Sequence, residues 1–113
     1  MLENVALGAE RYMNLLSARQ KLVASNIANA DTPDYKTKDI DFRGEFESQL
    51  AGSQPAAIEV SGLKTKNDGN NVDMDREARL LAENALRFNV AVNLAHSELQ
   101  TLKEAIQGGG SSS

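Results

Sequence analysis

The 113-residue chain contains no cysteine and no tryptophan, and its aromatic side chains are limited to three phenylalanines and two tyrosines. The absence of cysteine excludes disulfide bonds and thiolate metal sites, and it leaves the cellular compartment open. The shortage of large aromatic side chains leaves few residues that could fill a core. We therefore do not expect a compact, self-sufficient globule.

The chain also lacks a strong excess of one charge, because twelve Lys and Arg residues stand against sixteen Asp and Glu residues, for a formal charge of −4. Neither sign forms a run of five or more, so the electrostatic pattern of a nucleic-acid-binding protein is missing. Charged residues at positions 3, 11, 19 and 21 interrupt any membrane-length apolar run, and residues 1–30 lack the pattern of a cleaved signal peptide. We expect no nucleic-acid partner, no direct lipid anchor and no signal cleavage.

What the chain does have is a long apolar pattern with helical spacing toward its C-terminus. Apolar residues recur there at alternating intervals of four and three without a break, and residues 2–30 carry the same spacing with one polar member, Gln20. Such patterns are typical of helices that pack against other helices in a coiled coil. The C-terminal set, called the seam below, is Met74, Ala78, Leu81, Ala85, Phe88, Val92, Ala95, Leu99, Leu102 and Ile106.

The predicted fold is therefore mainly α. An N-terminal helix over residues 1–30 and a C-terminal helix over residues 72–107 are expected to form a coiled-coil-like pair. Residues 31–71 between them are expected to form a turn and an irregular middle segment. Residues 108–113 read Gly-Gly-Gly-Ser-Ser-Ser and predict a disordered tail, whether native or added, because they have no side chains able to pack.

The middle segment has too few apolar residues for more than a small cluster. Phe42, Phe46 and Leu50 recur at intervals of four and predict a short helix. Residues 58–60 alternate like a brief strand, which would be half of a small β-hairpin.

Charged residues in and after the middle segment have simple structural interpretations. Lysines and aspartates alternate over residues 36–41, which is typical of a solvated face. Asp73, Asp75 and Glu77 place negative charge at the positive N-terminal end of the second helix. Helix capping explains these acids better than a calcium loop does, because Val72 stands where an oxygen ligand would be needed.

The sequence shows no pattern of catalytic or cofactor chemistry. His96 is the single histidine, and we interpret it as a flanking residue on the second helix rather than as a ligand or a catalytic base. A phosphate-binding loop, a nucleophile motif and paired carboxylates with a plausible pocket are all missing. We therefore expect no enzyme activity, no cofactor and no metal.

The second helix is too apolar to be covered by this chain alone. Besides the seam it carries Leu80, Leu86, Val90 and Leu94, so its middle is apolar on nearly every side. A helix of this kind normally has several neighbours, and we expect other subunits to supply them. One alternative is an antiparallel two-helix hairpin closed by the middle segment. Another is a cytoplasmic coiled-coil adaptor or export chaperone, which would also explain the heptads.

Two separate stretches resemble a known family. Residues 25–36 read Ser-Asn-Ile-Ala-Asn-Ala-Asp-Thr-Pro-Asp-Tyr-Lys and resemble the N-terminal signature of bacterial flagellar rod and hook proteins. Residues 35–42 and residues 70–77, Asn-Asn-Val-Asp-Met-Asp-Arg-Glu, are similar to the proximal-rod members of that family. Asp34 stands where the family usually has Gly, and it would be a costlier residue if that position needs a positive φ.

The resemblance implies a structural subunit of the bacterial flagellar basal body. Such subunits are exported through the flagellar type III apparatus and assemble, with relatives and with copies of themselves, into a helical tube that crosses the periplasm and transmits torque. By family analogy the partners are other rod proteins, the basal FliE component, and the MS-ring and export-gate base. A head-to-tail contact between subunits would allow such a tube to extend.

Two groups of residues are expected to carry this role. A turn motif should set the exit of the first helix and steer the middle segment across a neighbour. An assembly interface should supply the packing surface. The turn motif is Asn26, Asn29, Thr32, Pro33 and Tyr35, and the interface is Leu81, Phe88, Val92, Leu99 and Leu102, with Leu16, Val23 and Ile27 opposite.

Overall fold

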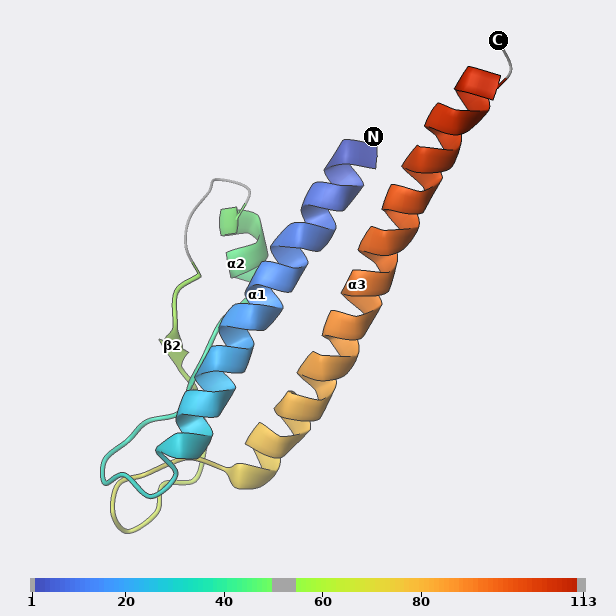
Figure 1. Ribbon diagram of the computed structural model, residues 1–113. Helices are drawn as coiled ribbons and strands as arrows, with labels where there is room; N and C mark the ends of the chain where they lie inside the picture. Colours follow the sequence, from blue (N-terminus) through green and yellow to red (C-terminus); the bar gives the residue numbers. More distant parts are fainter. Residues whose placement is uncertain (1, 50–54, 112–113) are drawn as a thin grey trace.

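The structure is a computed structural model that describes residues 2–49 and 55–111. The molecule is elongated, with extents of 72 × 27 × 18 Å along its principal axes (Figure 1). In chain order its elements are α1 (Leu2–Ala28), β1 (Lys38–Asp39), α2 (Phe42–Gln49), β2 (Ile58–Glu59) and α3 (Met74–Ser111). The predicted fold class is confirmed, because two long terminal helices pack together beside a short middle helix and a small antiparallel hairpin.

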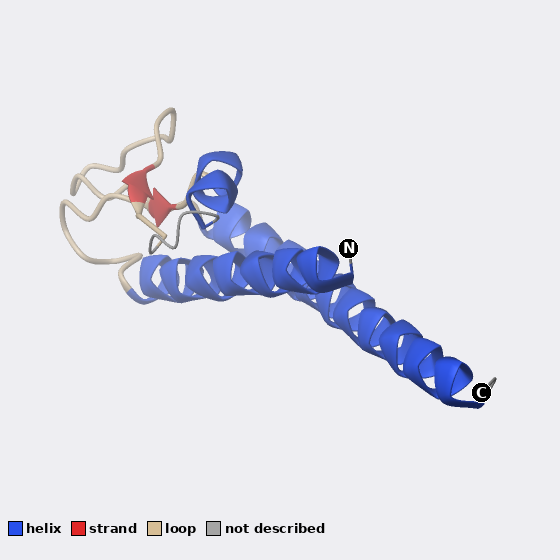
Figure 2. Ribbon diagram, turned by 90° about the horizontal axis from the view of Figure 1, so that it is seen from above, coloured by secondary structure: helices blue, strands red, loops and turns tan. Residues whose placement is uncertain are grey.

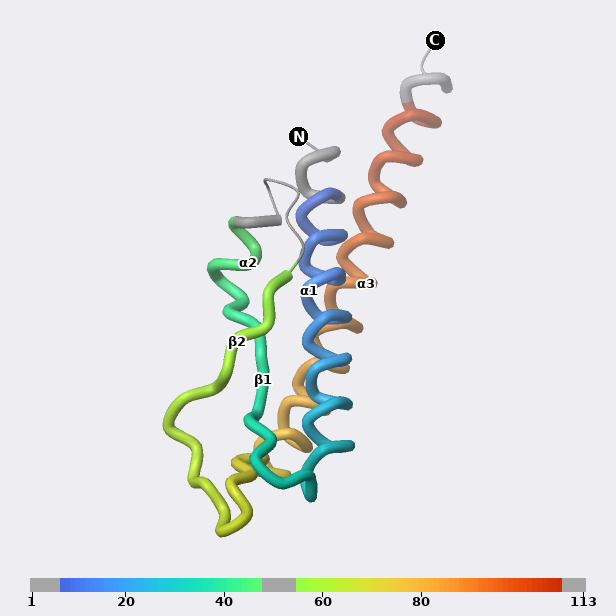
Figure 3. Tube along the Cα trace, turned by 90° about the vertical axis from the view of Figure 1, so that its left-hand side faces the viewer, coloured from blue at the N-terminus to red at the C-terminus, as the bar shows by residue number. Residues whose placement is uncertain are grey.

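Helix α1 is the central element. It contacts α3, α2 and β1, so the second long helix and the middle segment both pack against it (Figure 3). The axes of α1 and α3 run in opposite directions and are inclined to one another, and α3 continues well beyond the N-terminal end of α1 (Figure 2). The chain therefore covers only part of α3.

The core is a thin apolar layer around α1. Leu16 and Val23 are seven residues apart, so they lie on the same side of α1 two turns from each other. On α3 the buried side chains include Leu80 and Ala91 rather than the large members of the seam. Full burial of one large aliphatic side chain contributes about 1.5–3 kcal/mol. The buried apolar residues are Ala9, Leu15, Leu16, Val23, Ile40, Val72, Leu80 and Ala91.

The first turn of α3 is capped by the residue before it. The Asp73 carboxylate accepts hydrogen bonds from the backbone N–H groups of Asp75, at 3.0 Å, and Arg76, at 3.3 Å. These bonds satisfy two of the N–H groups that a helix leaves without an internal partner. At its other end α3 reaches Ser111, four residues beyond the predicted end at residue 107. Extending an existing helix by one residue is far easier than nucleating a new one, which accounts for the longer helix.

The middle segment holds a two-stranded antiparallel sheet in which Lys38 pairs with Glu59 and Asp39 pairs with Ile58. The predicted strand at residues 58–60 thus begins where expected. The predicted short helix is α2, and its Phe42 ring packs edge-on against Tyr12 of α1 with the ring centroids 6.0 Å apart. Leu50, the last residue of that predicted pattern, lies outside the described residues.

Candidate functional site

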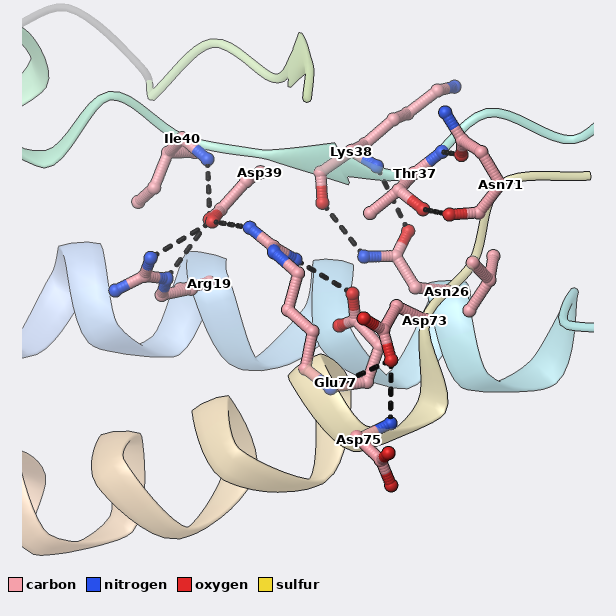
Figure 4. Close-up of polar contacts among 12 residues, drawn as sticks. Arg19, Asn26, Thr37, Lys38, Asp39, Ile40, Asn71, Asp73, Asp75 and Glu77 are labelled. Carbon is pink, nitrogen blue, oxygen red and sulfur yellow. Dashed lines mark hydrogen bonds and ion pairs between the residues drawn. The ribbon is translucent and has the colours of Figure 1, made fainter. Parts of the chain in front are cut away.

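The turn motif folds around Asn26, a fully buried residue near the end of α1. The Asn26 side-chain amide donates to the Lys38 carbonyl at 2.8 Å, and its oxygen accepts from the Lys38 N–H at 3.1 Å (Figure 4). The Tyr35 hydroxyl donates to the same Asn26 oxygen at 2.9 Å. Asn26 thus pairs with the backbone of β1 as a neighbouring strand would, and it fixes β1 along α1.

A second amide closes the turn that follows α1. The Asn70 side chain donates to the carbonyls of Asn29 and Thr32, each at 2.8 Å. The Thr32 hydroxyl donates to the Asn29 side-chain oxygen at 3.0 Å. Pro33 is exposed at the tip of this turn. Asn29 and Thr32 therefore set the exit of α1, with a partner from the segment just before α3.

The next residue, Asp34, adopts the positive φ that makes it a costlier residue than glycine. Asp34 has a φ of 63°, in the left-handed region that non-glycine residues seldom adopt. Its N–H donates to the Asp68 carbonyl at 2.9 Å. Its side chain occupies the space beside Gly69, where an added Cβ would overlap an Asp34 carboxylate oxygen. A residue larger than glycine at position 69 would collide with this turn.

Asn71 joins the start of β1 to the segment that leads into α3. Its side-chain oxygen accepts from the Thr37 N–H at 2.6 Å, and its carbonyl accepts from the Thr37 hydroxyl at 3.1 Å (Figure 4). The Asn71 N–H donates to the Tyr35 carbonyl at 3.2 Å. The two stretches that resemble the flagellar family, residues 25–42 and 70–77, therefore meet in one hydrogen-bonded network.

Four charged side chains continue this network between α1, β1 and α3. The Asp39 carboxylate accepts two hydrogen bonds from the Arg19 guanidinium, at 3.0 and 2.9 Å, and one from Arg76 at 2.7 Å. Arg76 also pairs with Glu77 at 2.8 Å. The Arg19 guanidinium lies 4.8 Å from the centre of the Phe42 ring, so it has an aromatic contact as well. The cluster is balanced, with two positive and two negative groups.

The cluster keeps Asp39 ionised. Burial on its own would raise the pKa of Asp39, but the hydrogen bonds from Arg19, from the Ile40 N–H and from Arg76 outweigh it, and the pKa lies below its ordinary value. Alternating charges at residues 36–41 predicted a solvated face, and this is wrong for Asp39, which is buried. The reason is that its two arginine partners come from positions 20 and 37 residues away.

The five interface residues expected on α3 all lie on its surface. Leu81, Phe88, Val92 and Leu102 are between 37% and 41% exposed, and Leu99 is 63% exposed. Of the three expected on α1, Leu16 and Val23 are buried within the chain and Ile27 is half-buried. The structure thus leaves the α3 group available to other molecules and uses Leu16 and Val23 in its own core.

Sequence patterns did not point to Arg19, Arg76 or Asn84. Asn84 is buried against α1, where its amide donates to the Leu16 carbonyl at 2.9 Å and to the Gln20 side-chain oxygen at 3.0 Å. A polar residue one position before the seam residue Ala85 was the available signal, but the residues it would meet lie 64 and 68 positions away.

Residues 2–49 and 55–111 contain neither a cluster of metal ligands nor a helix able to span a membrane. No group of three or more His, Asp or Glu side chains in these ranges is arranged to hold a metal ion. None of the helices described is both long enough and apolar enough to cross a membrane.

Comparison with known proteins gives consistent similarities. Residues 4–36 match the family described as "Flagella basal body rod protein". The chain is 31% identical to the flagellar basal body rod protein FlgB of Salmonella typhimurium, over 88% of this chain and 91% of that protein. It is 28% identical to FlgB of Proteus mirabilis over 96% and 97% of the two chains. It is also 28% identical to FlgB of Borrelia hermsii over 88% and 93%.

Proposed function

Because the chain belongs to the FlgB family of flagellar basal body rod proteins, we propose that it joins the rod by packing the exposed face of α3 against neighbouring subunits. The chain is a structural component of the basal body and not an enzyme. It assembles with other rod and basal-body proteins.

The exposed apolar face of α3 is the observation that supports this proposal most directly. Leu81, Phe88, Val92, Leu99 and Leu102 recur at heptad spacing along α3 and are all exposed. A contiguous exposed apolar patch on a soluble protein marks an interaction surface. Since each of these side chains would contribute on the order of 1 kcal/mol or more on burial, together they can stabilise a specific contact.

The buried members of the expected interface have a supporting role in this proposal. Leu16 and Val23 hold α1 against α3, and half-buried Ile27 lies near the end of that contact. Asn26 and the Asn29–Thr32 turn fix the middle segment beside α1. The turn motif would thereby hold α3 at a fixed angle to α1. It would also place exposed Pro33 in the turn that follows α1, where the middle segment could cross a neighbouring subunit.

The position of the chain in the rod and the identity of its partners are proposed from its family. We place the chain in the proximal rod, in the periplasm, after export through the flagellar type III apparatus without signal cleavage. Its partners would be other rod proteins, copies of itself, FliE and the MS-ring and export-gate base. Head-to-tail contacts of α3 faces would extend into a helical tube, and the tube would transmit torque through its packed helices.

Leu99→Asp tests the packing role. Leu99 lies on the exposed part of α3, so the charge should leave the monomer folded, and far-UV circular dichroism checks this. Gln100→Asp is the matched control, because it adds the same charge at the adjacent exposed position, off the seam. We expect Leu99→Asp to remove the chain from isolated basal bodies and abolish motility while export stays detectable. Normal motility with Leu99→Asp would refute the proposal.

A further inference from the structure

We infer that Asn84 determines which side of α3 packs against α1, and that it thereby keeps the seam free for other subunits. The inference deepens the proposed function and rests on it in one respect, since the seam is the face that we propose for assembly. Asn84 is a positioning residue, because it acts on α1 and α3 of its own chain and affects assembly through them.

Helix α3 turns a partly polar stripe toward α1, although a fully apolar one lies beside it. The side chains of α3 that the structure describes as buried are Glu77, Leu80, Asn84 and Ala91. The seam residues that directly follow these four are all apolar and all exposed, and they are Ala78, Leu81, Ala85 and Val92. At 3.6 residues per turn, the two stripes lie about 100° apart around the helix. Burial of apolar surface alone would favour packing of α1 on the seam.

The hydrogen bonds of Asn84 give a reason for the observed side. Its amide donates to the Leu16 carbonyl at 2.9 Å and to the Gln20 side-chain oxygen at 3.0 Å. Gln20 is the one polar member of the apolar pattern over residues 2–30, so the polar position of that pattern meets a polar position of α3. A rotation of α3 that brought the seam against α1 would turn Asn84 away from both acceptors.

Asn84 is better suited to choosing a side than to adding stability. It is 4% exposed, and its side-chain oxygen is buried without a partner among the residues that the structure describes. A buried acceptor without a partner is destabilising, so Asn84 stabilises this contact less than an apolar side chain would. Buried polar residues in helix pairs can specify one arrangement at a cost in stability. The two amide hydrogen bonds would therefore provide a preference for one side of α3.

Other polar contacts of α3 do not make this choice as directly. Glu77 pairs with Arg76 of the same helix, and Arg76 joins the first turn of α3 to Asp39 of β1 rather than to α1. Arg87 interacts with Tyr12 of α1, which raises the pKa of Arg87. The Arg87 side chain is 45% exposed, so water can replace that contact. Asn84 makes its contact with α1 in a buried position.

Two adjacent single-cysteine variants report which side of α3 faces α1. The chain has no cysteine of its own, so each introduced thiol is unique. Ala91 is 2% exposed and lines a hollow of about 360 Å³ that can hold the added sulfur, whereas Val92 is 41% exposed. In the folded chain, maleimide should label Val92→Cys about tenfold faster than Ala91→Cys, and in concentrated urea the two rates should be equal. The quotient of these two rates is the labelling ratio.

Asn84→Leu should lower the labelling ratio from about tenfold to below about threefold, because α1 would then pack on either side of α3. Leucine keeps the branched shape, and the adjacent groove of about 410 Å³ can accommodate its larger volume. The urea midpoint should be no lower than that of the wild type, since the unpartnered acceptor is removed as well.

Two further variants isolate the effect of the hydrogen bonds. Asn84→Ala removes the same bonds without adding apolar surface, and it should lower the labelling ratio in the same direction. Asn14→Leu is the matched control, because it makes the same chemical change at an exposed position of α1 and should leave the ratio near tenfold.

A labelling ratio that stays near tenfold in Asn84→Leu would overturn the inference, and a lower urea midpoint beside it would make Asn84 an ordinary stabilising contact. A ratio near one in the folded chain without these substitutions would also overturn it, since α3 would then have no fixed side. Detection of the unmodified chain in isolated basal bodies separates the two proposals. Its presence there with an unchanged ratio in Asn84→Leu would contradict this inference alone, and its absence would contradict the rod role itself.

Discussion

Replacing Asp39 with asparagine should destabilise the chain by about 3 kcal/mol, because it removes the charge that holds two arginines. The Asp39 side chain is 8% exposed, and those of Arg19 and Arg76 are 17% and 14% exposed, so the pairs are largely shielded from water. Removing one partner of a buried ion pair typically costs about 3–5 kcal/mol. We take the lower end, since Arg76 keeps its contact with Glu77.

Urea unfolding followed by far-UV circular dichroism near neutral pH measures this loss. A domain of this size is usually stable by about 5–15 kcal/mol, so a loss of 3 kcal/mol would move the midpoint clearly without changing the slope. Asp31→Asn is the matched control, because it makes the same chemical change at an exposed position and should stay within about 0.5 kcal/mol. If Asp39→Asn behaves like this control, the charged cluster does not hold the fold together.

The same variant should alter the acid response. The pKa of Asp39 is lowered in the folded chain, so its stabilisation is present above its ordinary value of 3.8 and is lost as the pH falls through the lower folded value. The wild-type chain should therefore lose more stability than Asp39→Asn when acidified below pH 3.8. Equal losses in the two chains would contradict the direction of the pKa shift.

Three further substitutions test individual parts of the fold by the same unfolding assay. Asn26→Ala removes three hydrogen bonds from a buried site and should cost about 2–3 kcal/mol; a cost below 1 kcal/mol would show that Asn26 does not fix β1. Gly69→Ala should cost at least 1 kcal/mol more than Gly62→Ala, since both have positive φ but only Gly69 abuts Asp34, and equal costs would exclude the steric argument. Gly8→Ala should stabilise α1 by about 0.5–1 kcal/mol, because an added Cβ there meets nothing within 4 Å, and a loss of stability would indicate an undetected neighbour.

Features that depend on nearby residues could be predicted from the sequence. The two long helices follow from apolar spacing, and the Asp73 cap follows from acids at the start of such a pattern. The short helix and the strand of the middle segment were also found from their periodicity. In each case the signal and the structure lie within a few residues of each other.

The sequence could not predict which side of α3 this chain would cover. Apolar residues lie on nearly every side of that helix, so its periodicity does not distinguish the seam from the side that carries Leu80 and Ala91. Helix α1 packs on the latter side and leaves most large seam residues exposed.

The charged cluster was missed for a related reason. Arg19, Asp39 and Arg76 lie far apart in the sequence, and only the folded chain brings them together, across 20 and 37 positions. The alternation of charges over residues 36–41 predicted a solvated face, and it therefore assigned Asp39 to solvent. Burial of a charge depends on partners that single-sequence patterns do not reveal.

The central claim is that the chain is a rod subunit, and detection of the chain in purified hook–basal bodies tests it most directly. Immunoblots would compare basal bodies, cytoplasm and periplasm from cells with and without a working flagellar export gate. The account predicts that the chain is present in the basal bodies only when the gate works. Retention in the cytoplasm and absence from basal bodies of gate-competent cells would contradict it.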